Sequence, residues 1–261
     1  MQIKEVNCIT ALSKSNLPGL DYSLNPYRGC LHNCAYCYVP NVLRIKRDAW
    51  GRFVDIKKNI PKVLSNELRN KKRGVIAIST VTDPYQPLEK KYKITRYCLE
   101  QLLIYDFPIC LQTKSKLIER DLDIISKFSN AEIMFSIGTL NDNERKLLEP
   151  YASTIKERLD TLKISSEIGI KTSIFFGPIY PTISSENLPK IIDTFKENGA
   201  KEIMIDKFNL KPGIKENIEK KIVSNKLFQE KFANSNSMYI LQKEKLYEIG
   251  KKTNIKIVDA F

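Results

Sequence analysis

Gly74-Val-Ile-Ala-Ile-Ser-Thr80 is the stretch of sequence that decides the fold. It is short, continuously apolar and rich in β-branched residues, which is typical of a strand buried on both faces of a parallel sheet. An amphipathic segment at residues 94–105 follows it, and then comes a second apolar run, Pro108-Ile-Cys-Leu-Gln-Thr113. A strand, a helix and a strand in this order predict a right-handed crossover between parallel strands.

The same alternation continues along the chain. Further strands are expected at residues 131–138, 171–177 and 201–206, and helical patterns at 155–168 and 187–197 end at or just before a glycine. A first strand around residues 21–27 brings the count to about six βα units. Six units are too few for a closed eight-unit barrel. The sequence therefore predicts an α/β fold, a partial (βα)6 TIM-type barrel with parallel strands, whose active site lies at the C-terminal ends of the strands.

Three segments are expected along the chain. Residues 1–18 are interpreted as a short N-terminal extension, residues 19–211 as the partial barrel, and residues 212–261 as a helical C-terminal cap with a last strand near residues 254–258. No run of about 18 apolar residues occurs, so we expect no membrane span. The first residues lack the apolar stretch of a signal peptide, which predicts a cytoplasmic protein. We expect a monomer, because no long apolar repeat indicates an obligate partner.

The chain is basic, with 43 Lys and Arg against 30 Asp and Glu, a net charge of +13. Such a balance fits a polyanionic partner such as nucleic acid, or an acidic redox carrier. The basic residues are scattered in short clusters without interleaved aromatic residues. A surface of solvated lysines is therefore the alternative interpretation of the same charge.

Three of the six cysteines lie in one motif, Asn25-Pro-Tyr-Arg-Gly-Cys30-Leu-His-Asn-Cys34-Ala-Tyr-Cys37. Thiolates are soft ligands that suit iron–sulfur clusters or zinc. Three of them can hold three corners of a 4Fe–4S cluster and leave one iron open, whereas electron-transfer clusters are closed by four cysteines. The alternative is a zinc site, which needs four ligands. His32, the only histidine, or one of the dispersed Cys8, Cys98 and Cys110 would then be the fourth.

The motif resembles that of the radical S-adenosylmethionine (SAM) superfamily, in which the residue before the third cysteine is usually aromatic, as Tyr36 is here. A narrower resemblance, to the spore photoproduct lyase-related or DNA-repair-photolyase-like group, covers roughly residues 20–210. It rests on seven short runs: Asn25-Pro-Tyr-Arg-Gly-Cys30, Thr82-Asp-Pro-Tyr-Gln-Pro87, Thr113-Lys-Ser115, Arg120-Asp121, Ser136-Ile-Gly-Thr139, Leu148-Glu-Pro150 and Arg158-Leu159.

The resemblance implies an enzyme that binds a 4Fe–4S cluster through Cys30, Cys34 and Cys37. Such an enzyme reductively cleaves SAM to methionine and a 5′-deoxyadenosyl radical, which abstracts hydrogen from a substrate. The cofactors carry that chemistry, and the protein binds and orients them. An electron donor of the ferredoxin or flavodoxin type is implied as well, because the cluster must be reduced for each cleavage.

Candidate SAM-binding residues lie in the loops after the strands. The family's Gly-Gly-Glu-like stretch is absent, and Thr80, Thr82 and Asp83 stand in its place; the alternative is a simple turn at Asp83-Pro84. Lys114 is a candidate for the methionine carboxylate, and Ser136 for the ribose or the carboxylate. The remaining candidates are Arg158 and Tyr36. A solvated lysine, a buried serine hydroxyl and a surface arginine are the respective alternatives for Lys114, Ser136 and Arg158.

One departure from the group concerns the hydrogen-donor cysteine that spore photoproduct lyase carries near the end of its second strand. Residues 76–83 contain no cysteine, which argues against dimer repair by that lyase mechanism. The sequence thus supports a radical SAM enzyme acting on nucleic acid or protein. The competing hypothesis is a non-catalytic Fe–S or zinc protein that binds nucleic acid.

Overall fold

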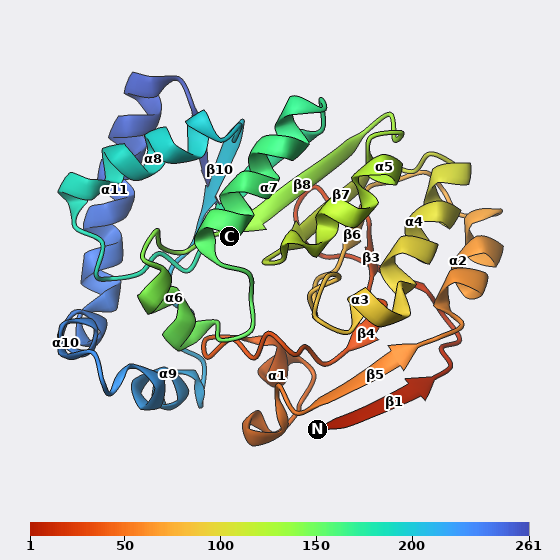
Figure 1. Ribbon diagram of the computed structural model, residues 1–261, viewed down its shortest axis with the longest axis horizontal. Coiled ribbons are helices and arrows are strands. Elements are labelled where there is room, and N and C mark those ends of the chain that lie inside the picture. Colours follow the sequence, from red (N-terminus) through yellow and green to blue (C-terminus); the bar gives the residue numbers. More distant parts are fainter. Residues whose placement is uncertain (261) are drawn as a thin grey trace.

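The computed structural model describes residues 1–260, and its centre is an eight-stranded sheet of order β11-β10-β9-β8-β7-β6-β3-β2 (Figure 1). All neighbouring strands in it are parallel except β2, which pairs antiparallel with β3. The bounds are β2 Leu12–Lys14, β3 Tyr22–Leu24, β6 Ile76–Ile78, β7 Ile109–Thr113, β8 Ala131–Ser136, β9 Lys171–Phe176, β10 Glu202–Ile205 and β11 Lys256–Asp259. Within the described chain β2 and β11 do not pair with each other. The predicted open α/β fold with parallel strands is confirmed.

Helices connect the parallel strands and cover the outer face of the sheet (Figure 1). The longer ones are α2 Ile60–Leu68, α4 Ile94–Ile104, α7 Ile155–Glu167 and α8 Leu188–Glu197. Helix α7 begins at a capping box formed by Thr154 and Glu157, and it ends before Gly169, whose φ of 86° only glycine adopts easily. The shorter ones are α1 Val39–Val42, α3 Glu89–Tyr92, α5 Leu122–Ile125 and α6 Asp142–Leu148, with 3₁₀ turns η1 Arg47–Ala49, η2 Lys116–Asp121 and η3 Ser185–Asn187.

A second, three-stranded sheet of order β1-β5-β4 was not expected from the sequence. Strand β1 (Gln2–Val6) pairs parallel with β5 (Phe53–Lys57), and β4 (Tyr27–Arg28) pairs antiparallel with β5. The first 18 residues therefore contribute a strand to each sheet. Sequence reasoning missed them because β1 finds its partner about fifty residues away.

The C-terminal part consists of helices α9 (Ile214–Ile222), α10 (Lys226–Ala233) and α11 (Ser235–Thr253), followed by β11. Strand β11 lies beside β10, with Glu202 opposite Lys256. The division of the chain at residues 18 and 211 stays a prediction. In residues 1–260, no helix combines the length and the apolar character that a membrane crossing requires.

Candidate functional site

The cysteine loop runs from β4 to α1 and lies across the C-terminal ends of β6, β7 and β8. Its three thiols are free; Cys30 is buried, and Cys34 and Cys37 are partly exposed. Burial raises the pKa of all three thiols, that of Cys30 to about 12. The charge of Cys37 raises the pKa of Cys30 and Cys34 further. Thiols in such surroundings become thiolates when they bind a metal centre.

The number of thiols in the loop bears on the choice between a zinc ion and a cluster. Among residues 1–260, no three His, Cys, Asp or Glu side chains are arranged to hold a metal ion, so the ligand geometry itself favours neither centre. Structural zinc requires four ligands on a single ion. In a 4Fe–4S cluster each thiolate binds a different iron, so three thiols from one loop fit a cluster with one open iron.

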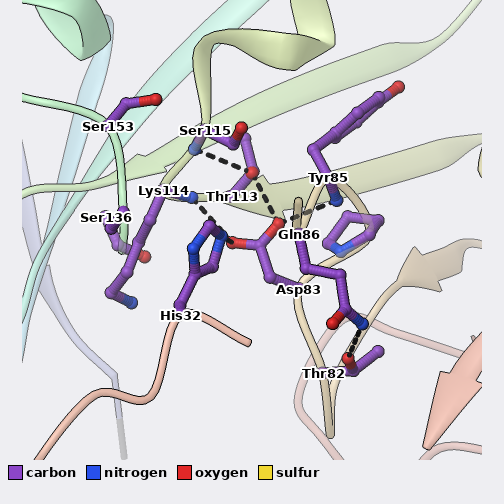
Figure 2. Close-up of polar contacts among 12 residues, drawn as sticks. His32, Thr82, Asp83, Tyr85, Gln86, Thr113, Lys114, Ser115, Ser136 and Ser153 are labelled. Atoms are coloured by element: carbon purple, nitrogen blue, oxygen red, sulfur yellow. Dashed lines mark hydrogen bonds and ion pairs between the residues drawn. The ribbon is translucent and has the colours of Figure 1, made fainter. Parts of the chain in front are cut away.

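Asp83, in the loop after β6, is the first anchor of the cysteine loop (Figure 2). Its Oδ1 accepts hydrogen bonds from the backbone N–H of Tyr85 and the hydroxyl of Thr113, both at 2.8 Å. Its Oδ2 accepts the backbone N–H of Lys114 at 2.9 Å. Burial opposes ionisation, but the neighbouring imidazole of His32 and these donors outweigh it and hold the pKa of Asp83 at about 2. Asp83 is therefore an ionised carboxylate that joins β6, β7 and the cysteine loop.

His32, between the first two cysteines of the motif, connects the loop to this carboxylate. The imidazole is buried, and its Nδ1 lies 3.0 Å from the carbonyl oxygen of Tyr151. Because a carbonyl only accepts, Nδ1 carries a proton. Nε2 lies 3.2 Å from Asp83 Oδ2, without the direction of a good hydrogen bond. His32 thus positions the middle of the loop from two sides.

Gln86, which sequence reasoning did not single out, brackets Cys30. Its Oε1 accepts the backbone N–H of Leu31 at 3.0 Å, and its Nε2 donates to the carbonyl oxygen of Gly29 at 3.2 Å. Thr82 donates its hydroxyl proton to the same Gly29 oxygen at 2.6 Å and accepts from Gln86 Nε2 at 3.1 Å. The hydroxyl of Thr82 therefore has both a hydrogen-bond acceptor and a hydrogen-bond donor within the protein.

Thr80 is held in a similar way by Asn25. The Asn25 Oδ1 accepts the backbone N–H groups of Thr80 and Val81 at 3.0 and 3.1 Å, and its Nδ2 lies 3.4 Å from the Thr80 hydroxyl. The hydroxyl of Tyr38 donates to the Thr80 carbonyl at 2.8 Å. The loop after β6 is thus tied to both ends of the cysteine motif.

Glu149, just after α6, is the second anchor and was not identified as a site residue from the sequence. The Tyr36 hydroxyl donates to its Oε1, and Arg158 Nη2 lies 2.5 Å from its Oε2. Arg158 also donates to the carbonyl oxygens of Ser136 at 2.7 Å and Ser153 at 3.0 Å. Burial would raise the pKa of Glu149, but the guanidinium group of Arg158 holds it below its usual value. Arg158 is fully buried, which excludes the surface arginine considered above.

Lys114 extends from the end of β7 toward the cysteine loop, near Ser136 (Figure 2). Its Nζ lies 5.8 Å from the centre of the Tyr36 ring. Burial raises the pKa of Cys34 and Cys37, and the ammonium charge of Lys114 acts against that increase. The Ser136 hydroxyl accepts a hydrogen bond from Gln112 at 3.1 Å. The ammonium group of Lys114 therefore lies close enough to act on the thiols of Cys34 and Cys37.

The segment between α1 and β5 packs against the outer side of the loop. Trp50 is buried with Cys30, and Arg47 donates to the carbonyl oxygen of Cys37 at 2.9 Å. Gly51 has a φ of 78°, and a Cβ there would lie 2.3 Å from the Cγ of Asn33. The two segments are in such close contact that position 51 has no room for a side chain.

Tyr180, in the loop after β9, is a further residue that the sequence did not reveal. Its hydroxyl is buried and has no hydrogen-bond partner within residues 1–260. Its ring lies 5.8 Å from that of Phe208, which in turn lies 6.0 Å from the ring of Tyr36. These aromatic side chains form the wall of the site on the β9–β10 side.

The fold is a parallel sheet covered by helices, with a loop of three cysteines at the C-terminal ends of the strands. Comparison with known sequences identifies the class of protein that has these features. Residues 24–206 match the family described as the Radical SAM superfamily. The chain belongs to this superfamily and is an enzyme.

Related sequences occur in archaea and in viruses. The chain is 33% identical over 184 residues to uncharacterized protein MJ0683 of Methanocaldococcus jannaschii, covering 70% of each chain. It is 30% identical over 171 residues to uncharacterized protein ORF301 of Acidianus two-tailed virus, covering 61% of this chain and 56% of the relative. A match at 26% identity, to the radical SAM Nalpha-GlyT isomerase of Pseudomonas phage M6, covers 60% of this chain and only 33% of that protein.

Among solved structures, a variant of spore photoproduct lyase matches with a TM-score of 0.73 at 13% identity, over 99% of this chain and 81% of that one. Another spore photoproduct lyase structure, with bound AdoMet and dinucleoside spore photoproduct, gives 0.69 at 12% identity over the same shares. Streptococcus suis SuiB bound to its precursor peptide SuiA gives 0.54 at 17% identity, over 99% of this chain and 48% of that one. The predicted fold and superfamily are confirmed.

Proposed function

We propose that Cys30, Cys34 and Cys37 hold a 4Fe–4S cluster whose open iron binds SAM. The observation that carries this proposal is the set of three free thiols in one loop, which Asp83 and Glu149 anchor at the C-terminal ends of the strands. When bound and reduced, the cluster would pass an electron to SAM and so give methionine and a 5′-deoxyadenosyl radical that abstracts hydrogen from the substrate.

Each surrounding residue then has a role that its contacts support. Lys114 pairs with the methionine carboxylate, because its ammonium group is directed at the cysteine loop. Ser136 offers its hydroxyl to the ribose or the carboxylate. Tyr36 and Arg158 act through Glu149 and hold the loop in position, since Arg158 has its donors on Glu149, Ser136 and Ser153.

Thr80, Thr82 and Asp83 are proposed as SAM-binding residues chiefly through their backbone. Both carboxylate oxygens of Asp83 have protein partners, and the Thr82 hydroxyl is committed to Gly29. These residues orient the loop after β6, so that its remaining backbone acceptors can meet the methionine amino group. They thereby fix the distance between the thiols and the strand ends.

For the substrate we favour nucleic acid over protein. The net charge of +13 is compatible with a phosphate backbone. This chain matches 81% of the spore photoproduct lyase structure that holds a dinucleoside, with a TM-score of 0.69. It matches only 48% of the peptide-bound SuiB, with a TM-score of 0.54. A ferredoxin or flavodoxin-type protein would supply the electron. A monomeric state and a cytoplasmic location stay predictions.

The test is anaerobic production of 5′-deoxyadenosine from SAM. Wild-type protein with a reconstituted, dithionite-reduced cluster should form it, and the Cys30→Ala, Cys34→Ala and Cys37→Ala variants should not. A matched control is Cys98→Ala, which removes a buried thiol outside the loop. Deoxyadenosine formation by all variants, or by none of the proteins despite a confirmed reduced cluster with oligonucleotide and peptide present, would contradict the proposal.

The substrate class is tested by binding. Affinity for a single-stranded oligonucleotide should fall steeply as salt rises, because each phosphate contact releases a counterion. Absence of binding at low salt would contradict a nucleic-acid substrate and leave protein as the substrate class.

A further inference from the structure

The outer side of the cysteine loop carries an open hollow of about 370 Å³ at the start of β1 and β5. Gln2, Lys46, Asp48, Ala49, Arg52 and Phe53 line it. It lies outside the eight-stranded sheet, on the side of the molecule where the N-terminus and α1 are found (Figure 1).

Phe53, which lines this hollow, belongs to the same packed cluster as two of the thiols. The ring of Phe53 lies 6.4 Å from that of Trp50, edge to face. Trp50 is 4% exposed and packs in one cluster with Cys30 and Cys37. Phe53 also contacts Gly29, where a Cβ would stand 2.4 Å from the Phe53 carbonyl oxygen. The hollow is thus a solvent-exposed surface directly behind the proposed cluster ligands.

The charged side chains at this hollow are mostly basic. Of the residues that line it, Lys46 and Arg52 are basic and Asp48 is acidic, and all three are exposed. Lys46 and Arg52 are exposed at the hollow, and Arg44 is exposed beside them in sequence. A local excess of positive charge attracts an acidic partner and raises its rate of encounter.

We propose that the hollow lined by Lys46, Ala49, Arg52 and Phe53 is the docking surface for an acidic one-electron carrier protein. This inference rests on the proposed function, since the carrier reduces the cluster. One electron leaves the carrier, which is oxidised by one electron, and enters the cluster, which passes from its 2+ to its 1+ state; no bond forms or breaks. A small, mainly electrostatic surface suits such a transient encounter.

The first experiment measures binding without turnover. Oxidised flavodoxin is titrated into the holoenzyme at low ionic strength, with the purification tag at the C-terminus because Gln2 lines the hollow. The Lys46→Glu/Arg52→Glu variant should bind about tenfold more weakly than wild type. The control Lys190→Glu/Lys201→Glu makes the same change in net charge at exposed positions elsewhere and should bind within about twofold of wild type.

The second experiment measures reduction of the cluster. Reduction by flavodoxin hydroquinone should be about tenfold slower in Lys46→Glu/Arg52→Glu and unchanged in the control, while reduction by dithionite should be equal in all three proteins. The milder Lys46→Gln/Arg52→Gln variant should show the same pattern with a smaller effect, which covers the case that charge reversal impairs folding.

Two outcomes would overturn the proposal. Equal losses of flavodoxin binding in the Lys46/Arg52 variant and its control would show an effect of overall charge only. Unchanged flavodoxin binding with weakened oligonucleotide binding would assign the hollow to nucleic acid. If wild type takes up dithionite electrons but forms no deoxyadenosine, the proposed function fails while the binding result still stands.

Discussion

The two anchors of the cysteine loop, Asp83 and Glu149, are both buried carboxylates, but their negative charges are stabilised in different ways. Asp83 is a buried carboxylate that accepts hydrogen bonds from two backbone N–H groups and one hydroxyl and lies beside the His32 imidazole, and the residues next to it in sequence supply part of this set. Glu149 is a buried carboxylate paired with one full guanidinium charge and one phenol from distant parts of the chain. The first anchor distributes its stabilisation over several weak partners, and the second concentrates it in a single ion pair. Removal of one partner should therefore cost more free energy of unfolding at Glu149 than at Asp83.

The largest effect is expected from Arg158→Met. This substitution leaves the Glu149 carboxylate buried without its counter-charge, which costs about 3–5 kcal/mol. Denaturant unfolding measures the loss, and Arg28→Met, which breaks an exposed ion pair with Asp55, should cost less than about 1 kcal/mol. Glu149→Gln combined with Arg158→Met should restore part of the stability. If Arg158→Met and Arg28→Met are equally mild, the ion pair does not act as described.

The next largest effect is expected on the pH dependence of the free energy of unfolding in Asp83→Asn. The pKa of Asp83 in the folded protein, about 2, lies below its ordinary value of 3.8, so its contribution is present above about pH 4 and is lost as the pH falls toward 2. That contribution is about 2 kcal/mol. Unfolding free energies measured from pH 6 to pH 2 should fall less steeply for Asp83→Asn than for wild type. The slope that remains reports on carboxylates such as Glu149, whose pKa is lowered in the same sense. Identical slopes in the two proteins would contradict the assignment.

A smaller effect is expected from Thr82→Val. It removes one hydroxyl bonded to the Gly29 carbonyl, which keeps Gln86 as a second donor, so the loss should be about 1 kcal/mol. Thr82→Ser retains the hydroxyl and should be near wild type. A large change in SAM affinity without a change in stability would show instead that the hydroxyl contacts SAM.

The smallest effect on stability is expected from Lys114→Gln, within about 0.5 kcal/mol, because its ammonium group acts on Glu149 only as a nearby charge and makes no hydrogen bond or ion pair with either anchor in the described residues. SAM affinity, measured by titration of the holoenzyme, should fall about tenfold or more. The exposed Lys190→Gln is the control and should change neither quantity. Loss of stability without loss of SAM affinity would contradict the role proposed for Lys114.

The sequence predicted the parallel strands because their apolar runs are continuous, and it singled out the cysteine loop because its three cysteines are local in sequence. It did not reveal the role of Glu149, whose partners Tyr36 and Arg158 are brought to it only by the folded chain. Arg158 was considered a surface residue as readily as a site residue, since a helix pattern does not say which arginine is buried. Gln86 was part of a recognised run, yet its hydrogen bonds to Gly29 and Leu31 depend on two loops meeting.

Gly51 has a consequence for how this family can diverge. A Cβ at position 51 would overlap the side chain of Asn33, which itself has a left-handed φ of 53° inside the cysteine motif. Position 51 therefore cannot change while Asn33 stays, whereas a smaller residue at position 33 leaves Gly51 undisturbed. In an alignment of relatives that retain the segment between the third cysteine and β5, positions 33 and 51 should co-vary, with any residue larger than glycine at 51 accompanied by a smaller one at 33. Evolutionary change at a position outside the motif is thus coupled to the spacing residues between its cysteines.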